Sequence, residues 1–135
     1  MLLKSEKATI EAGKKFAAKL HGGDIVLLEG VLGAGKTTFV KGMAEFFDIK
    51  KKITSPTFAL MNVYPVKPLN FVHVDTYRLK NEQELIDIGI EDYLGAPNTI
   101  CVIEWPEKIK TLLKNKKTLK VEFEHSGNGR EIKFS

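Results

Sequence analysis

Two helical patterns enclose a short apolar run in the first third of the chain. Between residues 5 and 20, apolar residues recur at spacings of three and four, and His21-Gly22-Gly23 ends this pattern as a helix C-cap would. The next run, Ile25-Val26-Leu27-Leu28, is apolar without interruption, which is typical of a strand buried on both faces of a parallel sheet. Helical spacing returns from Lys36 to Phe47. The pattern predicts a helix, a buried strand, a glycine-rich turn and a second helix.

The remaining apolar runs predict further strands and two shorter helices. Strands are expected at Phe58–Tyr64, Phe71–Asp75 and Ile100–Glu104, with a turn around Pro65 and Pro68 between the first two. Helices are expected at Glu82–Leu94, where Gly89 is a point of division, and at Pro106–Leu113. Alternating residues around Ser126-Gly127-Asn128-Gly129 predict a C-terminal β-hairpin. The expected fold class is α/β, with a central mixed, largely parallel sheet flanked by helices.

Composition narrows the class of protein. The 135 residues are 43% hydrophobic and 28% charged, which is typical of one soluble domain. The single cysteine, Cys101, lies in an apolar run and indicates a buried thiol in a reducing compartment. No apolar stretch is long enough to span a bilayer, so we expect a cytoplasmic protein without membrane contact. The net charge of +4 suits an acidic partner, but the lysine runs are more typical of solvated faces than of nucleic-acid contacts.

The stretch Gly30-Val31-Leu32-Gly33-Ala34-Gly35-Lys36-Thr37 fits the Walker A, or P-loop, pattern G-x-x-x-x-G-K-[ST]. Its glycines let backbone N–H groups turn inward, and the following helix N-terminus adds positive potential beneath phosphate oxygens. Lys36 is expected to bridge β- and γ-phosphates, and the Thr37 hydroxyl to bind Mg²⁺. A strand is predicted before this stretch and a helix after it, which favours a nucleotide site over a plain glycine turn.

Two carboxylates stand at predicted strand ends. Asp75 ends one apolar run and is the candidate Walker B ligand of Mg²⁺, although a turn or N-cap aspartate is the alternative interpretation. Glu104 ends another run and is placed to orient the attacking water or to help hold Mg²⁺. Trp105 follows it, and a lone tryptophan is usually an anchor. His73, on the strand of Asp75, is more typical of a hydrogen-bonded structural histidine than of a base.

A further loop, Thr54-Ser55-Pro56-Thr57, supplies hydroxyls where a γ-phosphate sensor would lie. With this loop, four motifs occur in one order and spacing, and together they closely resemble the TsaE (YjeE) family of bacterial ATPases over nearly the whole chain. The motifs are Leu32-Gly33-Ala34-Gly35-Lys36-Thr37-Thr38, Ser55-Pro56-Thr57-Phe58, His73-Val74-Asp75-Thr76-Tyr77-Arg78-Leu79 and Ile103-Glu104-Trp105-Pro106-Glu107.

The resemblance implies that residues 1–135 form one P-loop ATPase domain with weak intrinsic activity, using ATP and Mg²⁺. It implies docking onto a TsaB–TsaD complex that makes the threonylcarbamoyl modification on the adenosine beside the tRNA anticodon. Weak or indirect contact with tRNA stays open. Val31 departs from the family, which usually has an acidic residue there, but this position contributes backbone. The implied residues are Lys36, Asp75 and Glu104 for catalysis; Thr37, Asp75 and Glu104 for Mg²⁺; and Thr9, Gly33, Ala34, Gly35, Lys36, Thr37, Thr38, Ser55, Thr57, Trp105 and Arg130 for the nucleotide.

Three other functions compete with this interpretation. A GTPase would carry an Asn-Lys-x-Asp motif, and Asn115-Lys116-Lys117-Thr118 lacks the carboxylate, so ATP is preferred. A small-molecule kinase would close an arginine-bearing lid over its substrate, but the chain has only Arg78 and Arg130 and no segment left for a lid. A nucleotide-gated binding module, whose ATP state sets its affinity for a protein or tRNA, overlaps with the ATPase hypothesis and stays open.

Overall fold

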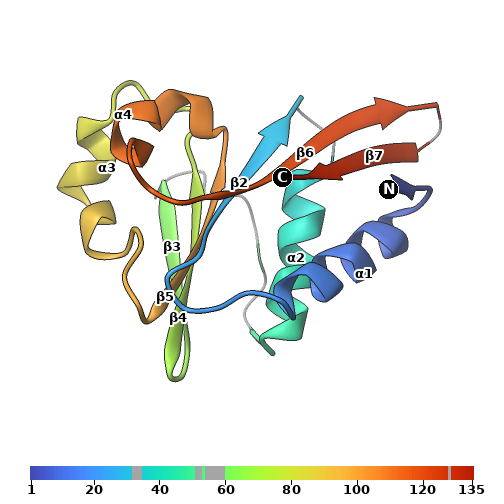
Figure 1. Ribbon diagram of the computed structural model, residues 1–135, viewed down its shortest axis with the longest axis horizontal. Coiled ribbons are helices and arrows are strands. Elements are labelled where there is room, and N and C mark those ends of the chain that lie inside the picture. The colour runs from blue at the N-terminus through green and yellow to red at the C-terminus, as the bar shows by residue number, and fades with distance from the viewer. Residues whose placement is uncertain (32–34, 51–52, 54–59, 128) are drawn as a thin grey trace.

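A single β-sheet with seven strands in the described part of the chain runs through the molecule (Figure 1). The structure is a computed structural model, and it describes residues 1–31, 35–50, 53, 60–127 and 129–135. The strand order is β1-β7-β6-β2-β5-β4-β3. The strands are β1 (Leu2–Leu3), β2 (Ile25–Gly30), β3 (Met61–Val66), β4 (Leu69–Asp75), β5 (Thr99–Glu104), β6 (Leu119–Ser126) and β7 (Gly129–Phe134).

The four central strands, β6, β2, β5 and β4, are parallel, and the outer pairings of β3 with β4, β6 with β7 and β7 with β1 are antiparallel. The register places Leu28 of β2 and Asp75 of β4 on either side of Glu104 in β5. The carboxyl ends of three strands therefore lie together at one edge of the sheet. In open α/β sheets this edge is where ligands bind.

Helices cover both faces of this sheet, with α1 and α2 on one face and α3 and α4 on the other (Figure 1). The side chain of Ser5 caps α1 by accepting a 3.0 Å hydrogen bond from the backbone N–H of Ala8. The helical segments are α1 (Glu6–Ala17), α2 (Lys36–Phe46), α3 (Gln83–Asp87), the 3₁₀ turns η1 (Ile90–Asp92) and η2 (Pro106–Ile109), and α4 (Lys110–Leu113).

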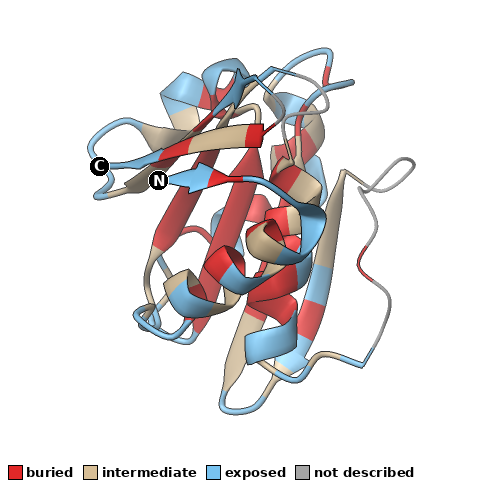
Figure 2. Cartoon of the chain, turned by 90° about the vertical axis from the view of Figure 1, so that its right-hand side faces the viewer, coloured by how far each residue is buried: buried red, intermediate tan, exposed pale blue. Residues whose placement is uncertain are grey.

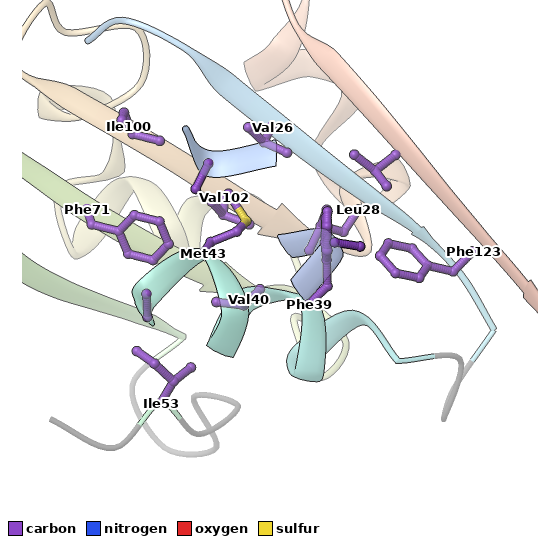
Figure 3. Close-up of a cluster of buried hydrophobic side chains, with 14 of the residues drawn as sticks. Val26, Leu28, Phe39, Val40, Met43, Ile53, Phe71, Ile100, Val102 and Phe123 are labelled. Atoms are coloured by element: carbon purple, nitrogen blue, oxygen red, sulfur yellow. The ribbon is translucent and has the colours of Figure 1, made fainter. Parts of the chain in front are cut away.

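The main core lies between the sheet and the α1–α2 pair. Figure 2 shows that the central strands are buried along most of their length, and Figure 3 shows side chains of α2 pointing toward those of the sheet. The two helices approach closely, because a Cβ atom on Gly13 would lie 2.2 Å from the carbonyl oxygen of Phe39, and one on Gly42 would lie 2.0 Å from that of Ile10. Only glycine fits at these two positions, so the contact fixes where α2 begins.

Most predicted elements are confirmed by the structure, including the C-terminal hairpin and the division of the third helix at Gly89, whose φ is +91°. The turn predicted around Pro65 and Pro68 begins later than expected: Pro65 lies inside β3, and the turn is at Lys67 and Pro68. Proline is tolerated there since β3 is an edge strand. The short strand β1 was not predicted. In the described residues, no helix has the length and apolar character needed to cross a membrane.

Candidate functional site

The turn from β2 into α2 depends on two glycines with positive φ. Gly30 ends β2 at φ +146°, and Gly35 caps α2 at φ +98°. Residues other than glycine rarely adopt such φ values. A Cβ atom on Gly35 would lie 3.7 Å from Cγ2 of Thr9 and 3.9 Å from Nε of Arg130. Thr9 and Arg130, which come from opposite ends of the chain and which the family resemblance implied for the nucleotide, therefore lie beside the turn.

Lys36, the first residue of α2, points inward. Lys36 is only 4% exposed, and its Nζ donates a 2.5 Å hydrogen bond to the carbonyl oxygen of Gly30. The same Nζ lies 3.5 Å from the ring centroid of Trp105, a distance typical of a cation–π contact. Burial lowers the pKa of Lys36, and nearby carboxylates, Glu104 foremost, oppose that shift. The ammonium group thus lies inside the site rather than in solvent.

Glu104 forms the centre of the site. It is 3% exposed, and its Oε2 lies 2.6 Å from Nε2 of His73, which is fully buried. The hydroxyl of Thr37 in α2 donates to the same carboxylate over longer distances, 3.4 Å to Oε1 and 3.3 Å to Oε2. The carboxylate therefore links β4, β5 and the first turn of α2.

The chain turns sharply after Glu104. Trp105 adopts the left-handed conformation, with φ +61° and ψ +51°, which costs a residue other than glycine about 1 kcal/mol or more. Thr76, buried at the end of β4, holds this turn: its hydroxyl donates to the carbonyl oxygens of Trp105, at 2.5 Å, and of Glu104, at 3.2 Å. In this conformation the Trp105 ring lies over the Lys36 ammonium group.

Asp75 lies opposite Glu104 in the parallel pairing of β4 with β5. Its Oδ1 accepts a 2.9 Å hydrogen bond from the backbone N–H of Tyr77, the pattern of an Asx turn. Glu104, then Glu107 and then Asp75 oppose the lowering of the Lys36 pKa. The two carboxylates that ended separate apolar runs in the sequence therefore lie side by side at the carboxyl edge of the sheet.

The structure brings most predicted residues together. Lys36, Thr37, Asp75, Glu104 and Trp105 surround one point at the carboxyl edge of the sheet, and Thr38 follows in the first turn of α2. Thr9, Gly35 and Arg130 lie together beside the turn. The predicted residues Gly33, Ala34, Ser55 and Thr57 lie outside the described residues.

One predicted residue has a partner that the sequence did not identify, and another residue was missed. His73 was expected to be a hydrogen-bonded structural histidine, and its contact with Glu104 confirms this; its position two residues before Asp75 places both side chains on one face of β4. Thr76 was not singled out, and no sequence signal marks its role, which depends on the backbone path of another strand. In the described residues, no group of three His, Cys, Asp or Glu side chains could hold a metal ion.

Comparisons with known proteins agree on one family. The model for "Threonylcarbamoyl adenosine biosynthesis protein TsaE" matches residues 3–132. A tRNA threonylcarbamoyladenosine biosynthesis protein TsaE from Rickettsia typhi is 44% identical over 112 residues, covering 82% of this chain and 76% of that protein. The protein of the same description from Borreliella burgdorferi is 34% identical over 132 residues, covering 98% and 96%. The crystal structure of Bacillus subtilis YdiB superposes with a TM-score of 0.82 at 31% identity, covering 99% of this chain and 82% of that one.

Proposed function

The chain belongs to the TsaE family of threonylcarbamoyl adenosine biosynthesis proteins, and we propose that it is a slow Mg²⁺-dependent ATPase that serves this tRNA modification. Its partner in the proposal is a TsaB–TsaD-type complex in the cytoplasm, which modifies the adenosine next to the anticodon. Contact with tRNA is then weak or indirect, through that complex.

One observation carries the proposal: a buried lysine and a threonine hydroxyl at the start of α2 face a carboxylate at the end of β5. Lys36 is buried, and its close contacts within the described residues are the Gly30 carbonyl oxygen and the Trp105 ring. Burying an ammonium group is costly unless it has partners of opposite charge. Phosphate oxygens at the N-terminus of α2 would supply that charge, and a helix N-terminus favours anions.

The described residues also fit Mg²⁺. This ion usually takes one or two carboxylates, keeps several waters and fills its shell with substrate phosphate oxygens, so it needs no cage made of protein alone. Thr37 and Glu104 already lie within hydrogen-bond distance of each other, and Asp75 stands beside Glu104 in the sheet. These three residues would hold the ion, and the bound ion would neutralise charge on the phosphates.

The chain's own residues then divide the work of hydrolysis. Lys36 binds and neutralises the phosphates that lie over the helix N-terminus. Glu104 orients a water molecule by accepting a hydrogen bond from it. The carboxylate can do so because His73 and Thr37 fix it on two sides. Trp105 covers Lys36 and excludes water from its ammonium group.

Turnover by the chain alone is expected to be slow. Of its two arginines, Arg78 is exposed and Arg130 lies beside Gly35. An arginine finger aimed at the transferring phosphoryl group is worth roughly 10³- to 10⁵-fold in rate. We infer that the partner complex supplies charge or ordering, so that hydrolysis is coupled to assembly.

A steady-state ATPase assay with and without the purified TsaB–TsaD pair tests the proposal. We expect turnover well below the median enzyme rate of roughly 10 per second for the chain alone, and a clear increase when the pair is added. Fast turnover that the partner does not change would contradict it, as would hydrolysis that needs no Mg²⁺.

A nucleotide gate is the second candidate, and the contact between Lys36 and Trp105 favours it. The ring of Trp105 packs against that of Tyr77 at a tilt of 44°, with ring centroids 5.0 Å apart, and Tyr77 is 45% exposed. A nucleotide that draws Lys36 away from Trp105 would change an aromatic pair on the surface. If partner affinity differs between ADP and a non-hydrolysable ATP analogue while modification continues without hydrolysis, the chain is a gate rather than a motor.

A further inference from the structure

His73 is a buried polar residue on the apolar side of the candidate site. It lies in the middle of β4, fully buried, on the same face of the strand as Phe71 and Asp75. Its cross-strand neighbours are Val102 in β5 and Asn62 in β3, and Phe71 and Val102 both belong to the core beneath α2. An apolar side chain would suit the side of this position that faces Phe71 and Val102.

The imidazole is only half satisfied there. Nε2 lies 2.6 Å from Oε2 of Glu104, whereas Nδ1 is buried and has no hydrogen-bond partner in the described part of the chain. A buried polar atom without a partner reduces stability. Packing alone therefore does not explain a histidine at this position. Its contact with Glu104 does, because an apolar residue could not make that hydrogen bond.

The two contacts of the Glu104 carboxylate differ in kind. The contact with His73 is short and joins two strands of the rigid central sheet, whereas those from the Thr37 hydroxyl are 3.3 and 3.4 Å long. Thr37 is also the residue expected to turn toward Mg²⁺. When its hydroxyl does so, the hydrogen bond from His73 is the contact from a side chain of the described residues that still holds the carboxylate.

We propose that His73 is a positioning residue for the ATPase reaction: its Nε2–H donates to Glu104 and holds the carboxylate in the orientation that directs water. The inference rests on the proposed function. A carboxylate only accepts hydrogen bonds, so this contact requires the hydrogen on Nε2.

Two substitutions separate positioning from packing. His73→Gln keeps an amide N–H able to donate to Glu104, whereas His73→Leu keeps bulk and removes the donor. Partners that orient a site's direct ligands typically contribute roughly 10- to 100-fold in activity. We expect His73→Leu to lower kcat by roughly that factor with little change in KM for ATP, and His73→Gln to restore most of it.

The kinetic test uses the full chain with the TsaB–TsaD pair and the variants His73→Leu, Glu104→Ala and both together. If His73 acts through Glu104, the leucine substitution has no further effect once Glu104 is alanine. Denaturant unfolding of His73→Leu provides the structural control, and we expect the variant to stay folded and to unfold in one cooperative transition, as the wild type does. A wild-type kcat in His73→Leu, or an equal loss with and without Glu104, would overturn the positioning role.

A spectroscopic test needs no activity. In a long-range ¹H–¹⁵N NMR spectrum of the nucleotide-free chain, we expect His73 to show a hydrogen on Nε2 whose resonance moves in Glu104→Ala, while the exposed His21 and His125 stay unchanged. A wild-type ring without a hydrogen on Nε2 would overturn the inference. If the wild type hydrolyses no ATP with its partner, the proposed function fails and the positioning role of His73 fails with it. Hydrolysis that is normal in His73→Leu overturns the positioning role alone.

Discussion

Strands β4 and β5 carry different side chains on their two faces, and the difference is largest near their carboxyl ends. Side chains alternate between the faces along each strand. On the face toward α3 and α4, the strands begin with the polar pair Asn70 and Thr99 and then carry only apolar or thiol side chains up to their carboxyl ends. On the face toward α2, the same strands change from apolar to polar over their last residues. The first set is Val72, Val74, Cys101 and Ile103, and the second is Phe71, His73, Asp75, Ile100, Val102 and Glu104.

The difference shows what a buried polar group needs. Glu104 is as buried as most of the apolar core, yet it has His73 and Thr37 within hydrogen-bond distance and Lys36 nearby. Buried charge is tolerated where partners satisfy it. Lys36 and Thr37 come from α2, which covers only one face, and His73 comes from β4 on that same face. The position of the helix and the polar residues that the strands carry beneath it together decide which face carries chemistry.

The largest effect is expected on the α2 face, from Lys36→Ala. Removing the cation that faces the phosphates should lower nucleotide-dependent activity by about 10³-fold or more. The fold should remain, because the ammonium group contributes a burial cost rather than apolar packing. ATPase assays and thermal melts check both points. Lys41→Ala, an exposed lysine on the same helix, is the matched control; an active or unfolded Lys36→Ala would refute the assignment.

The two carboxylates of this face should separate next. Glu104→Ala is expected to lower hydrolysis by roughly 10²-fold or more, because it removes the group that orients water. Asp75→Ala should chiefly weaken Mg²⁺-dependent ATP binding, because Asp75 is assigned to the metal. Nucleotide binding titrated with Mg²⁺ on each variant decides the matter. Equal losses of affinity in both would remove the distinction between their roles.

A substitution on the opposite face should alter stability and leave the chemistry intact. Ile103 is fully buried and precedes Glu104, but it points toward α3 and α4. Ile103→Ala should lower the free energy of unfolding by about 2 to 5 kcal/mol through lost packing and a cavity. Urea unfolding measures this loss, and kcat under folding conditions should stay close to that of the wild type. Ile88→Ala, at a residue that is 46% exposed, is the control and should have little effect on stability.

The contrast also shows what sequence could predict. Apolar runs such as Ile25–Leu28 located the buried strands, because a strand covered on both faces needs no polar residue. The P-loop pattern placed Lys36 and Thr37 at a helix start, and strand ends identified Asp75 and Glu104. Local patterns are sufficient for such features, since each depends on neighbours in the chain.

What sequence could not predict depends on pairing between distant segments. The contact of His73 with Glu104 needs the parallel register of β4 and β5, and the role of Thr76 needs the turn at Trp105. The strand β1 is two residues long and exists only because β7 pairs with it. Pro65 was expected in a turn, since its acceptance in β3 depends on the strand being at the edge of the sheet.

The smallest effect concerns Cys101, on the apolar face. Its Sγ is buried and donates to the carbonyl oxygen of Tyr93 at 3.6 Å, and burial raises the pKa of the thiol from its ordinary 9.0 to about 12. Between these values the folded state keeps the proton while the unfolded state loses it. Stability that is fully present below pH 9 is therefore lost as the pH rises toward 12.

The expected loss is about 1 kcal/mol between pH 9 and pH 10, since one pH unit corresponds to about 1.4 kcal/mol once the unfolded thiol is fully ionised. Urea unfolding of the wild type and of Cys101→Ala under reducing conditions measures it, because lysines and tyrosines titrate alike in both proteins. We expect the stability difference between the two proteins to shift by that amount in favour of Cys101→Ala. A difference that does not change with pH would mean that the thiolate is tolerated inside, and that this face is less strictly apolar than its packing indicates.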